Sequence, residues 1–495
     1  MLEEVLSVSW WGTRHERLRS PRGPLFCFRD SEVGQLMQHS SLFSRSRCFG
    51  RLRTAVARRE SSSSIEAWYV ALFAANLVMG MSSILLPLKL DRVLHLGPRE
   101  LGVLSTTASL GAVIGSLLWG RLSDAAHRRK GFVVASYFAV GILHAGFALS
   151  ASFRSLLICN ALLSFFWIAN ASVAVLLVIE RTSERSWESH ISALNLSGAV
   201  GWLLGLVLGG FGIGVVLEAF SMTGGIEILF AILSLFGFAS AALAAWLIPS
   251  TRARYTERRF RGLIVAAGNL LIEASRFNAL HLYHRMIPRR LGSLRRETRL
   301  FLLSSALAFT GIGFFGAPLA MLLSQHLGYS PSVVFYSYVM LHSGIVLAYP
   351  LALRRIKSRG NRRAQIAALS VRFVLFGLIG VFLALGARPT WGVAVPFLFL
   401  IGVSWAYFQL SGVALASRFA KPENRGLALG TYNAVAGGST MIAGVSSGYL
   451  AQGAGYSMTY IVASVLLLAS ILVLAKLPDP AALQAKIDPA AGEDV

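Results

Sequence analysis

Residues 120–131 read GRLSDAAHRRKG and place one carboxylate, four Lys or Arg side chains and a histidine between two long apolar runs. The runs cover residues 99–119 and 131–150. Each is long enough to cross a bilayer as a helix, which takes about 20 residues at 1.5 Å per residue. A helix also satisfies its own backbone hydrogen bonds in hydrocarbon. The charged stretch is therefore predicted to connect two transmembrane helices.

The same pattern of apolar runs and charged connections extends over most of the 495 residues, of which 55% are hydrophobic and 14% charged. With a mean hydropathy of +0.61, the chain has more apolar surface than a globular core can bury. We therefore predict an all-α polytopic membrane protein with twelve transmembrane helices in two halves of six. The predicted spans are residues 65–88, 99–119, 131–150, 155–179, 191–215, 226–248, 300–323, 331–353, 364–385, 391–417, 427–450 and 456–477.

The spans divide the chain into five segments. Residues 65–248 and 300–477 form the two six-helix halves, joined by a basic link over 249–299 with an amphipathic helical pattern suited to a membrane surface. Residues 1–64 hold eleven arginines and six acids, and this composition predicts a disordered tail, with a small folded or nucleic-acid-binding module as the alternative. Residues 478–495 form a second tail.

Lys and Arg are distributed unevenly between the two sets of connections, which indicates the orientation. Cytoplasmic connections carry the excess of Lys and Arg. The set that includes 120–130 and 249–299 holds 27 of them, and the opposite set holds 5. Both termini are therefore predicted to be cytoplasmic, in a plasma or inner membrane. The net charge of +23 follows from this topology, so we do not interpret it as affinity for nucleic acid.

Within this twelve-span plan, the pattern G-x-L-x-D-x-x-H-R-R over residues 120–129 resembles the signature loop of the major facilitator superfamily. The resemblance implies that this loop fastens the two halves together on the cytoplasmic side when the cavity faces outward. It assigns this latch to Gly120, Asp124, Arg128 and Arg129. Ala125 and His127 depart from the family pattern.

The corresponding stretch of the second half, LRRIKSRGNRR at 353–363, keeps Gly360 and Arg362 but has Lys357 where the aspartate is expected. Only one carboxylate latch is therefore predicted. For both stretches the alternative is a plain cytoplasmic charge cluster.

The fifth span contains GWLLGLVLGG, which spaces small residues so that helix backbones can approach closely. This run resembles a glycine element found typically in exporters and antiporters of the superfamily, with Leu206 in place of its proline. The predicted helix-packing residues are Gly201, Gly205, Gly209 and Gly210.

The resemblance implies that the first, fourth, seventh and tenth spans line the solute cavity. Polar or aromatic side chains near their midpoints are the candidates for solute contact, although hydrogen bonding between helices is the other explanation for such residues. This chemistry favours a neutral or weakly polar organic solute. The candidates are Asn76 and Ser82 in the first span, Trp167 and Asn170 in the fourth, Thr310 in the seventh, and Trp405, Tyr407 and Gln409 in the tenth.

Coupling to protons has few candidate residues. The predicted spans hold no Asp or Glu deeper than about one turn, so His144 and His342 are the candidate proton carriers. Arg372 is explained by snorkelling of its long side chain to the inner face. Uniport stays open as an alternative.

Together these patterns predict a monomeric secondary transporter of a small organic solute that works by alternating access, with export or antiport as one option for its direction and import left open. A uniporter and a non-transporting scaffold or sensor are the alternatives. An enzyme is not indicated, because the chain contains no H-E-x-x-H, G-x-S-x-G or nucleotide-binding lysine loop. The three cysteines have no metal-ligand spacing, and neither a cofactor nor a nucleic-acid partner is expected.

Overall fold

The computed structural model describes residues 66–126, 129–181, 187–248, 294–420 and 425–479. Side chains are not described for residues 117, 120–126, 171–173, 175–176, 179–181, 187–189, 191–192 and 425–427. The tail over 1–64, the amphipathic part of the link and residues 480–495 lie outside the described ranges.

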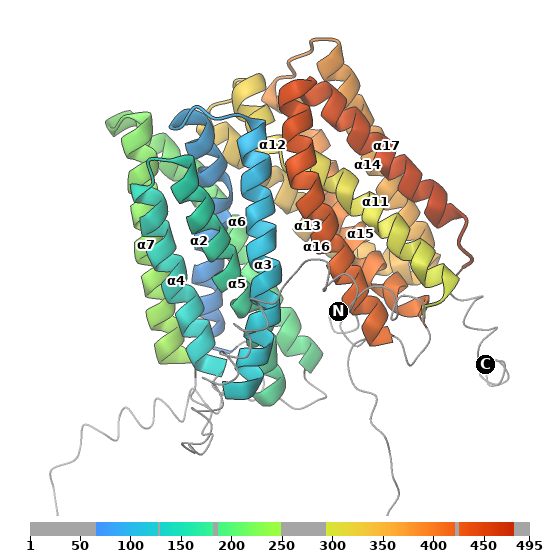
Figure 1. Ribbon diagram of the computed structural model, residues 1–495, viewed down its shortest axis with the longest axis horizontal. Coiled ribbons are helices and arrows are strands. Elements are labelled where there is room, and N and C mark those ends of the chain that lie inside the picture. The colour runs from blue at the N-terminus through green and yellow to red at the C-terminus, as the bar shows by residue number, and fades with distance from the viewer. Residues whose placement is uncertain (1–65, 127–128, 182–186, 249–293, 421–424, 480–495) are drawn as a thin grey trace, which may run out of the picture.

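The described residues form two groups of long helices that lie side by side (Figure 1). The first group contains α2 (Tyr69–Arg92), α3 (Pro98–Ala126), α4 (Arg129–Leu149), α5 (Phe153–Arg181), α6 (Trp187–Ala219) and α7 (Met222–Leu247). The second contains α11 (Arg296–Gly316), α13 (Pro331–Arg359), α14 (Asn361–Ala384), α15 (Trp391–Arg418), α16 (Arg425–Gly453) and α17 (Gly455–Ala475). The predicted all-α fold with twelve long helices is confirmed.

Ten of these helices are long and apolar enough to cross a membrane, judged on the described residues by length and composition. α3 and α16 are not among the ten. Both are rich in Gly, Ser and Thr, as the stretches STTASLG and GTYNAVAGGST show. They pack against each other, and a helix that faces protein over part of its surface needs fewer apolar side chains than one surrounded by lipid.

The predicted connection over residues 120–130 is mostly helical. α3 continues to Ala126 and α4 begins at Arg129, so only two residues separate the helices. This stretch contains no proline, and its alanines favour the helix. In the second half, a single residue, Gly360, separates α13 from α14, and its φ of 82° is a value that glycine adopts without steric cost.

The predicted span over 300–323 is broken in its last third. α11 ends at Gly316, and a short helix α12 (Leu319–Met321) and a π-helix η2 (Leu322–His326) follow. Pro318 lies at the break, where its missing N–H removes a helical hydrogen bond. The seventh long helix therefore ends in a separate segment, α12–η2.

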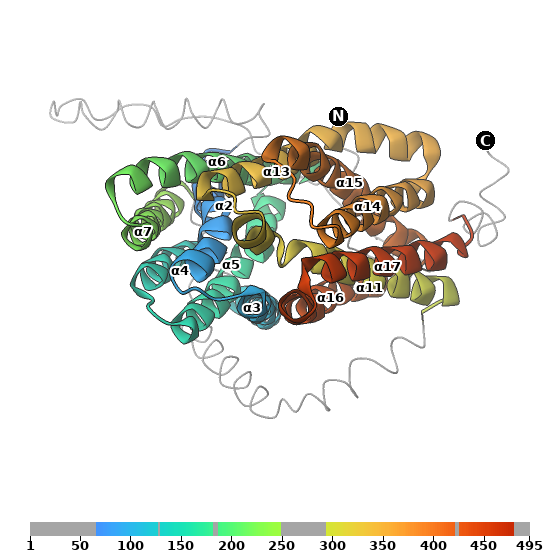
Figure 2. The same ribbon diagram turned by 90° about the horizontal axis from the view of Figure 1, so that it is seen from above.

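We call the end of the bundle where α3 meets α4, α5 meets α6 and α13 meets α14 the basic end, and the opposite end the far end. The basic end is the one predicted to be cytoplasmic. The two halves meet along two seams: α3 packs against α16, and α6 packs against α13 (Figure 2). Each seam joins the second helix of one half to the fifth helix of the other.

Candidate functional site

The seam between α3 and α16 is built from glycines that bring two backbones together. A Cβ on Gly102 would overlap the backbone oxygen of Gly444, and a Cβ on Gly448 would overlap that of Pro98. Thr106 Oγ1 also donates to the backbone oxygen of Met441 across the seam, at 2.8 Å. These contacts all lie in the half of the bundle nearer the far end.

The seam between α6 and α13 is built from aromatic side chains that enter glycine notches. Gly209 of α6 faces the ring of Phe335, and Gly210 faces the ring of Tyr336. Closer to the middle of the bundle, Trp202 stacks on His342 with ring centroids 6.3 Å apart.

The four glycines predicted to pack as one element therefore serve two partners. Gly201 and Gly205 lie against the backbone of α2, where a Cβ would overlap the carbonyl oxygens of Phe73 and Leu77. Gly209 and Gly210 face the other half. The motif joins α6 both to its own half and to the second one.

α2 and the α12–η2 segment make a third contact between the halves at the far end. The Arg92 guanidinium donates to the backbone oxygen of Ser324 at 2.9 Å, and Gln325 donates to the backbone oxygen of Leu96 at 2.9 Å. Arg92 is also paired with the buried carboxylate of Asp91, at 3.1 Å between Nε and Oδ2.

Toward the basic end, the described glycines of α16 no longer contact α3 closely, although Tyr432 stays packed against Phe301 and Phe309 of α11. A Cβ on Gly430 or Gly438 would have no neighbour within 4 Å, and one on Gly437 would touch only Val113 of α3, at 3.9 Å. Asn433 is exposed. Among the described residues, the tight contacts between α3 and α16 are thus confined to the far half of the seam.

The polar candidates of the first half are engaged mainly within that half. Asn170 accepts a hydrogen bond from the Tyr137 hydroxyl at 2.7 Å and is buried, which fits a helix-to-helix contact. Asn76 donates to the backbone oxygen of Leu72 at 2.9 Å and lies beside Gly198 of α6. Ser82 is 3% exposed, and Trp167 is half-buried against the apolar core.

The candidates of the second half differ in exposure. Thr310 donates to the backbone oxygen of Ala306 in its own helix at 2.8 Å. Gln409 is exposed and accepts a hydrogen bond from the Tyr349 hydroxyl at 2.8 Å. Tyr407 is half-buried beside the small apolar cluster that joins α13 to α15. Gln409 is the candidate most open to a solute.

The two candidate proton carriers have different surroundings. His144 is fully buried within the first half, where its Nδ1 lies 2.7 Å from the backbone oxygen of Val140 and its ring packs against Phe147 and Phe230. His342 lies on the seam between the halves, against Trp202. Of the two, only His342 contacts both halves.

Arg372 is not a snorkelling residue. It is 2% exposed, donates to the backbone oxygen of Ile401 at 2.9 Å, and lies over the rings of Phe376 and Trp405 at 5.9 and 5.3 Å. It occupies the middle of α14, too far from either end for its side chain to reach water, so α15 provides a carbonyl and a ring for the charge instead.

Lys89 is a second buried cation that is satisfied inside one half. Its ammonium donates to the backbone oxygens of Phe147 and Ala148, at 2.5 and 3.2 Å. These carbonyls lie at the C-terminal end of α4, where the helix dipole attracts a positive charge. Lys89 therefore ties α2 to α4.

The latch residues predicted at the basic end can be placed only in part. Gly120 and Asp124 lie in the last two turns of α3, but their side chains are not described, and Arg128 falls in the gap between α3 and α4. Arg129 is the first residue of α4 and is 9% exposed. The latch stays a prediction.

Trp202 is one of the seam residues that the sequence patterns did not single out. Its indole N–H is buried and makes no hydrogen bond to any described residue. Its position inside the glycine run of α6 was a usable signal, because a bulky aromatic among small residues points away from the packed backbones. In the described part of the chain, no group of three His, Cys, Asp or Glu side chains is arranged to hold a metal ion.

Comparison with known proteins agrees with this architecture. The family model described as Major Facilitator Superfamily matches residues 68–411 and 370–493. A crystal structure of the nucleoside transporter NupG is similar, with a TM-score of 0.61, 11% identity, and coverage of 83% of this chain and 98% of that one. A D-xylose–proton symporter is similar with a TM-score of 0.61 and 13% identity, and the match covers 83% of this chain and 98% of that one. A mutant of the peptide transporter POT has a TM-score of 0.64 and 14% identity, with coverage of 84% of this chain and 94% of that one. No curated protein matches the sequence.

Proposed function

Because the chain belongs to the major facilitator superfamily, we propose that it is a secondary transporter that moves a small organic solute by alternating access. The observation that carries this proposal is the distribution of contacts between the halves. The contacts described above for Gly102, Thr106, Arg92 and Gln325 lie toward the far end, whereas the described glycines of α16 nearer the basic end make no close contact with α3. The described arrangement then corresponds to a state that is closed at the far end.

The proposed solute is neutral or weakly polar. The candidate solute contacts are mostly rings and amides, such as Trp167, Asn76 and Gln409, and the buried cations Lys89 and Arg372 are already bound to backbone carbonyls of their own half. The similar structures include carriers named for nucleosides, D-xylose and peptides. These three chemistries therefore provide the first panel of solutes.

We assign proton coupling, where it occurs, to His342. A histidine whose protonation is to favour one conformation must lie where the conformations differ. His342 contacts Trp202 of the opposite half, whereas the contacts of His144 stay within the first half.

The test is solute uptake into proteoliposomes with and without a pH gradient. Radiolabelled nucleosides, D-xylose and dipeptides are the solutes, and empty liposomes are the control. We expect saturable uptake or counterflow of at least one solute class. The direction of the pH gradient that drives accumulation then distinguishes export or antiport from import, and uptake that does not respond to the gradient indicates a uniporter.

His342→Gln and His144→Gln form a matched pair in the same assay. We expect His342→Gln to abolish the response to the pH gradient, and His144→Gln to lower stability by about 1–3 kcal/mol through its buried hydrogen bond while keeping the response. Binding of a solute without any flux would contradict transport and favour the sensor alternative.

A further inference from the structure

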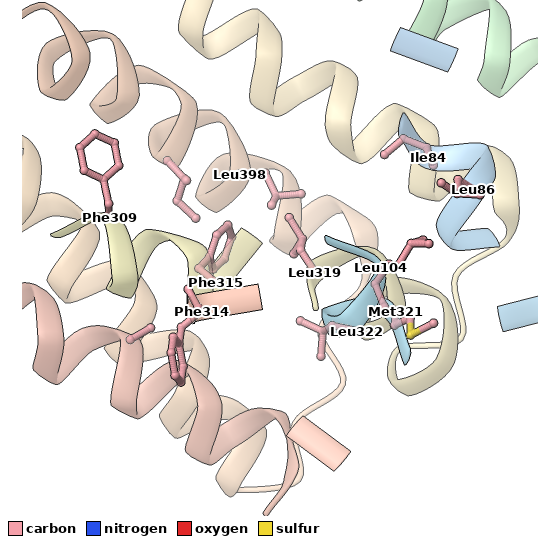
Figure 3. Packing of buried hydrophobic residues seen from close by; sticks show 14 of the residues in the cluster. Ile84, Leu86, Leu104, Phe309, Phe314, Phe315, Leu319, Met321, Leu322 and Leu398 are labelled. Carbon is pink, nitrogen blue, oxygen red and sulfur yellow. The ribbon is translucent and has the colours of Figure 1, made fainter. Parts of the chain in front are cut away.

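A groove lined by apolar residues lies at the far end of the second half, between the α11–η2 region, α14 and α15. Phe315, Leu322, Ala394 and Leu398 form parts of its wall. Figure 3 shows Phe315, Leu319, Leu322 and Leu398 around the place where these elements meet. The predicted solute contacts do not line this groove, so it is separate from the proposed transport site.

The groove exists because the seventh long helix is broken. Pro318 ends the regular hydrogen bonding, and the π-helical turn at Leu322–His326 widens the backbone that follows. Side chains of this segment therefore do not fill the space against α14 and α15 as a continuous helix would.

The mouth of the groove opens on a surface that faces the bilayer. Phe382 of α14 and Val393 of α15 line the groove and are 38% and 51% exposed. Both helices are long and apolar enough to span a membrane. Hydrocarbon surrounds such a surface, and an apolar cavity does not hold water. The material that reaches the groove is therefore a lipid acyl chain.

A positively charged side chain, that of Arg388, lies near the mouth of the groove. Arg388 lies in the turn between α14 and α15 and is exposed, and the next residue, Pro389, lines the groove. The turn is held in place because the Tyr329 hydroxyl donates to the backbone oxygen of Pro389 at 2.6 Å. No ion pair within the described ranges involves Arg388. A guanidinium at this level of a membrane protein is suited to a lipid phosphate.

We propose that this groove binds one acyl chain of a phospholipid from the far leaflet, with the phosphate of its head group on Arg388. The occupant is held on three sides by the α12–η2 segment, α14 and α15. On the same segment, the Ser324 oxygen accepts from Arg92 of α2, and Gln325 donates to Leu96 in the turn that follows α2. The bound chain thus fills the space behind the segment that closes the far end.

The experiment uses the full-length protein in nanodiscs that contain a phosphatidylglycerol with a photoreactive diazirine at the end of one acyl chain. After illumination, peptides are mapped by mass spectrometry. We expect adducts concentrated in peptides that cover residues 319–327 and 393–398. Ala394→Trp fills the groove and should lower their yield at least fivefold. Ala367→Trp, at an exposed position of α14 nearer the basic end, is the matched control and should leave the yield unchanged.

If Ala394→Trp does not fold, Val393→Trp at the exposed mouth replaces it. Adducts spread evenly over the lipid-facing helices, or an equal yield in the groove and control variants, would overturn the site. A diacylglycerol with the same diazirine tests the head group: we expect it to label the groove several-fold less than the phospholipid, and Arg388→Gln to remove that difference. Equal labelling by the two lipids in the unchanged protein would overturn the assignment to a phospholipid.

Discussion

The two seams between the halves pair the same helices of each half but use different contacts. On the α3–α16 seam, backbone lies on backbone, with Gly102 and Gly448 at the closest points. On the α6–α13 seam, rings enter notches, as Phe335 does at Gly209. A backbone cannot yield to an added methyl group, whereas a ring can rotate. The comparison indicates that the first seam is the stiffer of the two.

The difference also affects how far each seam can open. The described glycine contacts between α3 and α16 are confined to the far half of this seam, so the two helices can separate at that point. The α6–α13 seam extends from Gly214, which lies beside Ser332 near the far end, to Trp202 near the middle of the bundle. We infer that the rings between α6 and α13 change their arrangement while staying in contact, as α3 and α16 part.

One reporter serves the predictions that follow. Thr106→Cys is placed in a chain whose Cys27, Cys48 and Cys159 are replaced by serine, and its reaction with a membrane-impermeant maleimide is measured from the far side. The position is half-buried on the α3–α16 seam, so its labelling rate rises when the far end opens.

The largest effect is expected from an added methyl group on the stiff seam. Gly102→Ala places a Cβ on the Gly444 backbone and should cost about 1–3 kcal/mol in the closed state, which raises labelling by at least fivefold. Gly210→Ala is the matched change on the other seam, where the half-buried Tyr336 ring can move, and should raise labelling less than twofold. An equal rise in labelling for Gly102→Ala and Gly210→Ala would contradict the inference that the α3–α16 seam is the stiffer one.

The next effect concerns the basic ends of the two seams. If Asp124 latches the basic end when the far end is open, Asp124→Asn disfavours that state by about 1–2 kcal/mol. Labelling of the reporter should then fall about five- to thirtyfold, and a separate Asn76→Cys reporter should react faster from the cytoplasmic side. Lys357→Asp, at the basic end of α13, should act in the opposite direction. Unchanged rates in both variants would leave residues 120–131 as a topology signal alone.

A smaller change is expected at the contact between α2 and η2. Arg92→Gln removes the charge-assisted hydrogen bond to the Ser324 oxygen, which on a partly exposed side chain is worth about 1 kcal/mol. Labelling should rise about fivefold. Ser83→Ala, which removes only a hydrogen bond within α2, is the control and should have no effect. A rise of similar size in the control would show that the reporter follows stability and not closure.

The smallest change is expected from the ring contact on the flexible seam. Trp202→Phe reduces the ring area stacked on His342. The closed state should lose about 0.5 kcal/mol of stability, which raises labelling roughly twofold. Trp167→Phe, which changes the same residue type away from the seam, should leave the rate unchanged. A tenfold effect of Trp202→Phe would mean that the ring seam carries more of the closure than the glycine seam.

The helices were predictable from the sequence because hydropathy over about 20 residues reports on the surrounding lipid. The features that the sequence did not predict depend on contacts between residues far apart in the chain, which no local pattern contains. The partner of Asn170 is Tyr137 on the neighbouring helix, and Arg372 depends on a carbonyl and a ring of α15. The π-helical turn after Pro318 was missed for the same reason, since a proline indicates a break but not how the chain continues.

The candidate site was predictable only as a set of polar residues on the expected helices. Distance along the chain does not show which side chains cross from one half to the other, as the contact between Arg92 and Ser324 does over 232 residues. Glycine spacing predicted that α6 packs closely, but not that the run divides between α2 and α13. Pairings of this kind depend on how the two halves dock.

The most direct measurement for alternating access is a disulfide across the stiff seam. A Cβ on residue 444 would lie 2.9 Å from Thr106 Oγ1, so Thr106→Cys with Gly444→Cys can form a disulfide when the far end is closed. Ser304→Cys with Ser470→Cys, whose hydroxyl oxygens lie 2.9 Å apart within the second half, is the matched control. We predict that oxidation stops solute uptake into proteoliposomes in the first pair, that reduction restores it, and that the control pair transports in both states. Full-rate transport with the Thr106 to Gly444 cross-link completely formed would contradict alternating access about these seams.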